Sequence, residues 1–213
     1  PNPEHTHMFE LGMQWGRENA AHMRPVEIEN EGLKLAGEYF DFGAERCVII
    51  FPGRTETLYY SYYFAEPYVA AGCNVLVVDP RAHGLSDGKY NCCGTKEFSD
   101  VLAWTVFAHE TLHNREIVLH GICVGGSAVV LAAARPEFPP YVSHLVVEGL
   151  FATFKESFKL HMKAEGKPVF PVMNEIFWIA KRESGVDVAK NAPIRCIDRV
   201  KTPILFLHGT KDT

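Results

Sequence analysis

The sequence lacks the features of a membrane protein and of a nucleic-acid-binding protein. No stretch approaches the ~20 apolar residues that span a bilayer, and residues 1–7 have no apolar signal core. Acidic residues outnumber basic ones by 26 to 21, which gives a net charge of −5. There is also no block of like charges and no basic stripe that could neutralise phosphates. We therefore expect neither a membrane nor a nucleic acid among the partners.

Cysteine is too sparse for a disulfide scaffold. Six cysteines are scattered over 213 residues, whereas disulfide-stabilised scaffolds are short and much richer in cysteine. A reducing, cytoplasmic location is therefore expected. No C-x-x-C pair occurs, and the adjacent residues Cys92 and Cys93 are poorly spaced for a tetrahedral metal. The sequence predicts neither a metal site nor a cofactor.

What the sequence does contain is an alternation of strand and helix patterns. Residues 26–42 alternate apolar and polar side chains on both sides of Glu31-Gly32, which predicts an antiparallel hairpin. Short apolar runs rich in Val and Ile then predict strands buried on both faces, at 47–53, 74–80, 116–120, 142–149 and 203–209. Helical patterns lie between them at 95–113 and 125–135. This order predicts one compact α/β domain with a mostly parallel sheet.

Residues 151–199 form an insertion longer than the single crossover helix that joins two parallel strands. Two amphipathic helices are predicted there, with apolar faces formed by Phe154, Phe158 and Met162 and by Met173, Phe177 and Ala180. Such helices either pack on the sheet or form a cap that closes a pocket, and the length of the insertion favours a cap. The expected organisation is an N-terminal arm (1–24), a core (25–150), a helical cap (151–199) and a last core strand with its loop (200–213).

The segment Gly121-Ile122-Cys123-Val124-Gly125-Gly126 carries the predicted chemistry. It lies between a predicted strand and a predicted helix, where a sharp turn requires very small residues two positions before and after the central one. Gly121 and Gly125 meet that requirement. The turn would expose the Cys123 side chain above the sheet, at a helix N-terminus that favours an anion. The pattern indicates a nucleophile elbow with Cys123 as the nucleophile.

With these residues the chain resembles the α/β-hydrolase family, from residue 26 to its end. VIIFPGRTE (48–56) resembles the family's loop after the third strand, and VLVVDPRAHGLSDG (75–88) its fourth-strand signature. FLHGTKD (206–212) resembles the strand ending that presents the triad acid. Within the family the pattern is similar to the serine-aminopeptidase-like branch with a helical cap after strand six, and the elbow is similar to that of dienelactone hydrolase. The resemblance implies that Val124 and Arg54 supply the oxyanion-hole N–H groups and that Asp212 is the acid.

Two departures from the family pattern matter. Cys123 stands where most relatives have Ser, which retains nucleophilic chemistry and would give a thioester intermediate. An inert Cys in a catalytically silent protein, or a Ser replaced by Cys, are the alternatives. In addition, no His follows Asp212, although the family order is nucleophile, acid, histidine. We expect the natural protein to continue past Thr213 with a strand, a helix and that His, and to have lost residues before Pro1.

The function predicted is hydrolysis of a carboxylic ester, thioester or amide through an acyl-enzyme on Cys123. An acyltransferase of the same fold and a silent binding protein remain as alternatives. The partner would be a small-molecule acyl substrate, which Glu148 at a strand end and Tyr59 beside the oxyanion loop are candidates to contact. Among the ten histidines none is a convincing base, and His83 is expected to brace its loop. The oligomeric state is not indicated by the sequence.

Overall fold

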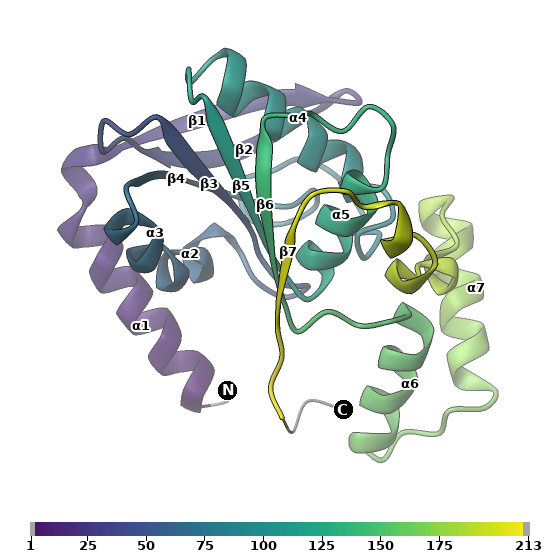
Figure 1. Cartoon of the computed structure of the whole chain (residues 1–213). Coiled ribbons are helices and arrows are strands. Elements are labelled where there is room, and N and C mark those ends of the chain that lie inside the picture. The colour runs from purple at the N-terminus through teal and green to yellow at the C-terminus, as the bar shows by residue number, and fades with distance from the viewer. Residues whose placement is uncertain (1–2, 211–213) are drawn as a thin grey trace.

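The structure is a computed structural model that describes residues 3–210 and is built on a seven-stranded sheet (Figure 1). The strands run in the order β1-β2-β4-β3-β5-β6-β7. Both pairs that involve β2 are antiparallel and the others are parallel. The strands are β1 (Met23–Asn30), β2 (Leu33–Phe40), β3 (Arg46–Phe51), β4 (Cys73–Val78), β5 (Glu116–Ile122), β6 (Val142–Glu148) and β7 (Ile204–Leu207). The predicted α/β fold with a mostly parallel sheet is confirmed.

The predicted hairpin is formed by β1 and β2. Asn30 pairs with Leu33 across a turn in which Glu31 has φ 52° and Gly32 has φ 74°. Two positive φ values in a two-residue loop give a turn whose twist matches that of the flanking strands. The hairpin joins the sheet where Gly37 to Phe40 pair with β4.

Helices cover both faces of the sheet, which explains the continuous apolar runs of its central strands. In β3, Val48 and Ile50 pack on the face that contains Trp15 and Tyr62, while Ile49 packs on the opposite face. The first face carries α1 (Pro3–Glu18), α2 (Leu58–Ser61) and α3 (Glu66–Ala70), and the second carries α4 (Glu97–Glu110) and α5 (Val124–Ala133) (Figure 1). Most of the N-terminal arm is therefore the helix α1. Its Trp15 attaches it to α3, because the indole N–H donates to the Glu66 carboxylate at 2.8 Å.

Two helices, α6 (Phe154–Ala164) and α7 (Val172–Ser184), lie between β6 and β7 in the chain. They form a separate apolar cluster with residues near the start of α5, namely Cys92 and Val124. The helical pair α6–α7 therefore packs beside the carboxyl ends of the strands rather than as a layer on the sheet (Figure 1). Short 3-10 turns lead from α7 back to β7, at Val188–Lys190, Pro193–Arg195 and Ile197–Arg199; two others are Ala20–His22 and Tyr62–Phe64.

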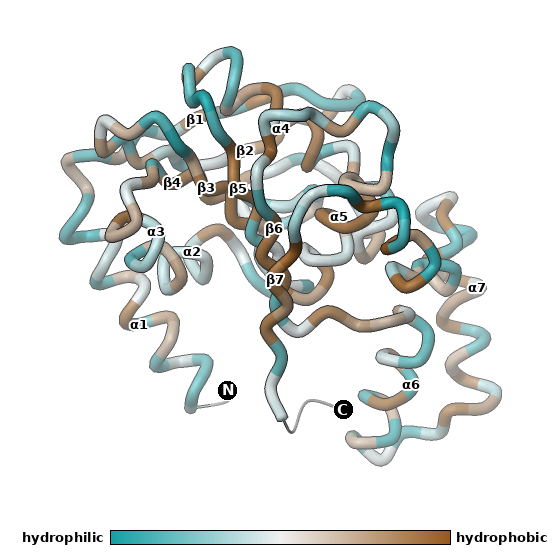
Figure 2. The backbone as a smooth tube through the Cα atoms, viewed as in Figure 1, coloured by the Kyte–Doolittle hydropathy of each residue, from teal (hydrophilic) through white to brown (hydrophobic). Residues whose placement is uncertain are grey.

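The last strand, β7, is the apolar edge of the sheet (Figure 2). Its residues Leu205, Phe206 and Leu207 are exposed, in contrast to β4, in which every residue is buried. Among residues 3–210, no helix combines the length and the apolar character needed to cross a bilayer.

Candidate active site

Cys123 lies at the turn between β5 and α5, with φ 52° and ψ −108°. Positive φ is costly for a residue with a side chain and persists only where the surroundings impose it. Here the Cys123 N–H donates to the carbonyl oxygen of Glu148 at 2.8 Å, so β6 holds the turn in place. The sharp strand-to-helix geometry expected of a nucleophile elbow is present at this residue.

Gly121 and Gly125 permit this turn through close backbone contacts. A Cβ on Gly121 would lie 2.5 Å from the Cα of Gly126, and a Cβ on Gly125 would lie 2.2 Å from the carbonyl oxygen of Phe51. Neither contact can be relieved by a small side-chain movement, because backbone atoms lie on both sides. Gly125 therefore lets the first turn of α5 pack directly against the end of β3, where the 53–56 loop begins.

The 53–56 loop carries Arg54, the second residue expected to form the oxyanion hole. The Gly53 N–H donates to the Glu56 carboxylate at 2.8 Å, and the Glu56 N–H donates to the Gly53 carbonyl oxygen at 3.3 Å. The Nε2 atom of His83 lies 2.6 Å from the Arg54 carbonyl oxygen, and its Nδ1 atom lies 3.2 Å from the Arg81 carbonyl oxygen. His83 thus braces the Arg54 peptide, as the sequence predicts.

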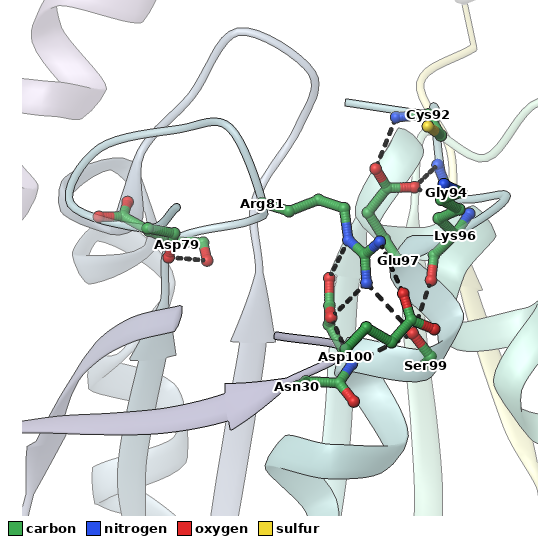
Figure 3. Close-up of polar contacts among 11 residues, drawn as sticks. Asn30, Asp79, Arg81, Cys92, Gly94, Lys96, Glu97, Ser99 and Asp100 are labelled. Carbon is green, nitrogen blue, oxygen red and sulfur yellow. Dashed lines mark hydrogen bonds and ion pairs between the residues drawn. The ribbon is translucent and has the colours of Figure 1, made fainter. Parts of the chain in front are cut away.

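Buried polar contacts hold the loop from Asp79 to Gly88, which follows β4 (Figure 3). The Asp79 carboxylate accepts hydrogen bonds from the N–H groups of Leu58 at 2.8 Å and Leu85 at 2.9 Å. Arg81 donates twice to Asp100, each time at 2.7 Å. Burial acts to lower the pKa of the Arg81 guanidinium, but its bonds to Asp100 outweigh this effect and leave the pKa raised. Asp79 and Arg81 therefore stabilise this loop.

A second brace supports the loop that leads into α4 (Figure 3). The buried Glu97 carboxylate accepts hydrogen bonds from the N–H groups of Cys92 at 2.6 Å and Gly94 at 2.8 Å. Burial raises the pKa of Glu97. The carbonyl oxygen of Cys93, between these two donors, accepts a short hydrogen bond from the amide of Asn191.

Two cavities open on Cys123. The smaller, of about 40 Å³, is lined from the core side by Arg54, Cys123 and Val124, and from the other side by Phe151, Phe154, Ser157, Phe158 and His161. The larger, of about 480 Å³, is lined by Cys123, residues 149–153 after β6, His208, and a face of α6 that includes Glu156, Ser157, Leu160 and His161. The structure therefore brings Cys123, Val124 and Arg54 together, with the apolar face of α6 opposite them.

The remaining site candidates lie elsewhere. Neither Glu148 nor Tyr59 is among the described residues that line the two cavities. The Glu148 carboxylate lies 3.8 Å from Nε2 of the buried His120. Tyr59 makes an edge contact with Tyr62, with ring centroids 5.7 Å apart. Asp212 lies outside the described residues. Within residues 3–210, no three His, Cys, Asp or Glu side chains are grouped so as to hold a metal ion.

The sequence interpretation missed two residues: His161, which lines both cavities, and Asn191, which supports the surrounding loops. His161 lies seven residues after Phe154, so the helical period that identified Phe154 and Phe158 also places His161 on their face. Its Nδ1 lies 2.8 Å from the carbonyl oxygen of Ser157, so Nδ1 carries the proton. Asn191 bonds to Ser127 on α5 at 2.9 Å and to Cys93. A single Asn in a loop has no periodic signal that could have revealed it.

Comparison with known proteins identifies the family to which this fold belongs. Residues 46–167, more than half of the chain, match the α/β hydrolase fold family, and the chain belongs to that family. It is 27% identical over 167 residues to the uncharacterized protein YqkD of Bacillus subtilis, covering 78% of this chain and 54% of that protein. The chain thus spans about half the length of this curated relative.

Solved structures show the same fold. The esterase Pf2001 of Pyrococcus furiosus superposes with a TM-score of 0.70 at 22% identity, over 90% of this chain and 72% of the esterase. An α/β hydrolase from Vibrio vulnificus gives a TM-score of 0.70 at 17% identity, over 96% of this chain and 70% of that protein. At such identities the likeness establishes the fold of this chain and not its substrate.

Proposed function

We propose that this protein is a hydrolase that cleaves a carboxylic ester, thioester or amide through Cys123. The observation that carries the proposal is the strained turn at Cys123, which places its thiol beside a cavity that Val124 and Arg54 also line. Val124 is the first residue of α5, and the first N–H groups of a helix have no acceptor within it. Such N–H groups are suited to hold a developing oxyanion.

The proposed reaction has two stages. The Cys123 sulfur, having given up its proton, attacks the carbonyl carbon and forms a C–S bond, while the carbonyl electrons move to an oxygen held by the N–H groups of Val124 and Arg54. Collapse of this intermediate breaks the bond to the leaving group, which takes up the proton. Water then attacks the thioester and releases the acid and the thiol. In this proposal Asp212 orients the histidine that is expected to follow it in the natural protein, and that histidine carries the proton.

Release of p-nitrophenol from p-nitrophenyl acetate tests the proposal. We expect a rapid first turnover followed by slower steady release, and loss of both in Cys123→Ala. The rate of ester hydrolysis by Cys123→Ala should be at least about 10²-fold lower than that of the wild-type protein, as expected when a nucleophile is removed. Equal rates in the two proteins would contradict the proposal. A steady rate that rises when a primary amine is added, with amide as product, would identify the same covalent chemistry as acyl transfer instead of hydrolysis.

A further inference from the structure

The smaller of the two cavities at Cys123 has a wall made of aromatic rings that hold one another in place. Phe151 and Phe154 meet with ring centroids 5.5 Å apart, and Phe154 and Phe158 with centroids 5.9 Å apart. Phe177 on α7 closes the cluster, since its ring centroid lies 5.3 Å from that of Phe158. Rings packed on several sides leave little room for rearrangement, because displacing one ring displaces its neighbours.

The chemistry of the proposed function distinguishes the two cavities. The residues expected to hold the oxyanion, Arg54 and Val124, line the smaller cavity. His208, which directly follows β7, lines the larger cavity. Phenyl rings form most of the wall opposite Cys123 in the smaller cavity, whereas Thr153, Glu156 and His208 give the larger cavity polar lining. The leaving group therefore belongs in the larger cavity, and the acyl chain points into the smaller one.

We propose that the aromatic cavity is an acyl pocket that admits only short acyl groups, with Phe158 setting its depth. This inference rests on the proposed function. A volume of about 40 Å³ corresponds to roughly three water-sized sites, which an acyl chain of about two to four carbon atoms fills. Phe158 lines this cavity and is less buried in the cluster than Phe154, so we infer that its ring is the one a longer chain would displace. The substrate class is thus the short-chain acyl ester, thioester or amide with a larger leaving group.

The test is the rate of Cys123 acylation by p-nitrophenyl esters of increasing chain length, from acetate to decanoate. The wild-type protein should react fastest at about two to four carbons. Phe158→Ala should raise the rate with octanoate relative to acetate by at least about tenfold, because each methylene group placed in a fitted apolar site changes discrimination by that order. Phe170→Ala is the matched control, since Phe170 is 80% exposed and lies outside the cavity wall.

Phe158→Leu provides a second, milder variant in case the alanine variant does not fold, and it should shift the preference in the same direction. An unchanged ratio of octanoate to acetate rates in a folded Phe158 variant would overturn the inference. So would a wild-type protein that prefers decanoate.

A second measurement separates the cavity from the catalysis. Alkyl methanethiosulfonates transfer an alkylthio group to a thiol, forming a disulfide and releasing methanesulfinic acid, without any need for an oxyanion hole. Methyl and butyl reagents should modify Cys123 faster than the octyl reagent, and Phe158→Ala should narrow the difference. If no ester acylates Cys123 but the methyl and butyl reagents still modify it faster than the octyl reagent, the proposed function fails and the size limit stands. If the three reagents modify Cys123 at equal rates, the pocket assignment fails regardless of the rates of acylation by the esters.

Discussion

Cys123 differs from the other cysteines in its surroundings. Burial raises the pKa of each of the other thiols, and that of Cys93 rises to about 12; the group comprises Cys47, Cys73, Cys92, Cys93 and Cys196. Only the thiolate reacts rapidly, so a raised pKa lowers reactivity near neutral pH. Cys123 instead lies at the first turn of α5 and lines two cavities.

We therefore expect iodoacetamide near pH 7.5 to label Cys123 at least about tenfold faster than the other five cysteines. Peptide mass spectrometry after short exposures measures each site. Raising the pH should reduce the advantage of Cys123, because the other thiols ionise as the pH approaches their raised pKa values. Labelling of Cys123 no faster than Cys93 would favour an inert, hydrolase-shaped protein.

Gly125 supports the same turn through its lack of a side chain. Gly125→Ala should lower the free energy of unfolding by about 3 kcal/mol, at the upper end of overpacking costs, because its Cβ would lie 2.2 Å from the Phe51 carbonyl oxygen. The control is Gly72→Ala, at a position with φ 77° and open space, which should cost about 1 kcal/mol for the backbone alone. Urea unfolding gives both values. Equal losses would argue against a tightly fitted elbow.

Among the elements, the sheet and the elbow followed directly from the sequence, whereas the loop contacts did not. Apolar runs such as 74–80 predict a strand buried on both faces, and β4 is buried throughout. The partners of Arg81 are different: Glu31 and Asp100 are far from it in the chain, and charged residues carry no periodic signal that pairs them. Single polar side chains acquire their roles from the fold.

The buried pair of Arg81 and Asp100 should dominate the stability of the loop that follows β4. Asp100→Asn should reduce the free energy of unfolding by about 3–5 kcal/mol, since it removes the buried counter-charge of a buried guanidinium. Glu31→Gln is the control, because Glu31 bonds to the same Arg81 but its side chain is 51% exposed. It should cost about 0–1 kcal/mol. Chemical denaturation measures the free energy of unfolding of both variants. Similar losses in the two would refute the claim that the Arg81–Asp100 pair dominates the stability of this loop.

For the whole molecule, the position of the helical pair α6–α7 relative to the core decides the shape of the site. The sequence favoured a cap only through the length of the insertion, because the apolar faces of α6 and α7 are compatible both with a cap and with packing on the sheet. In the structure these faces meet Val124 and Cys92 beside the strand ends. Asn191, buried after α7, bonds to Ser127 and Cys93 and so joins this region to the core.

Asn191→Ala should loosen that connection. We expect a loss of about 1–3 kcal/mol, the cost of leaving buried partners unsatisfied, and faster proteolysis within residues 151–199. Asn174→Ala on the exposed side of α7 is the control and should change neither quantity. Limited proteolysis followed by mass spectrometry locates the cuts. Cleavage that is no faster than in the wild-type protein would show that Asn191 does not hold the helical pair in place.

The most direct test of the central claim is the mass of the protein after brief incubation with p-nitrophenyl acetate, compared with Cys123→Ala under the same conditions. We expect one acetyl group per wild-type molecule, located on the peptide that contains Cys123 and lost on incubation with hydroxylamine, and none on the variant. An acetyl group on any other residue, or the same adduct in Cys123→Ala, would contradict it.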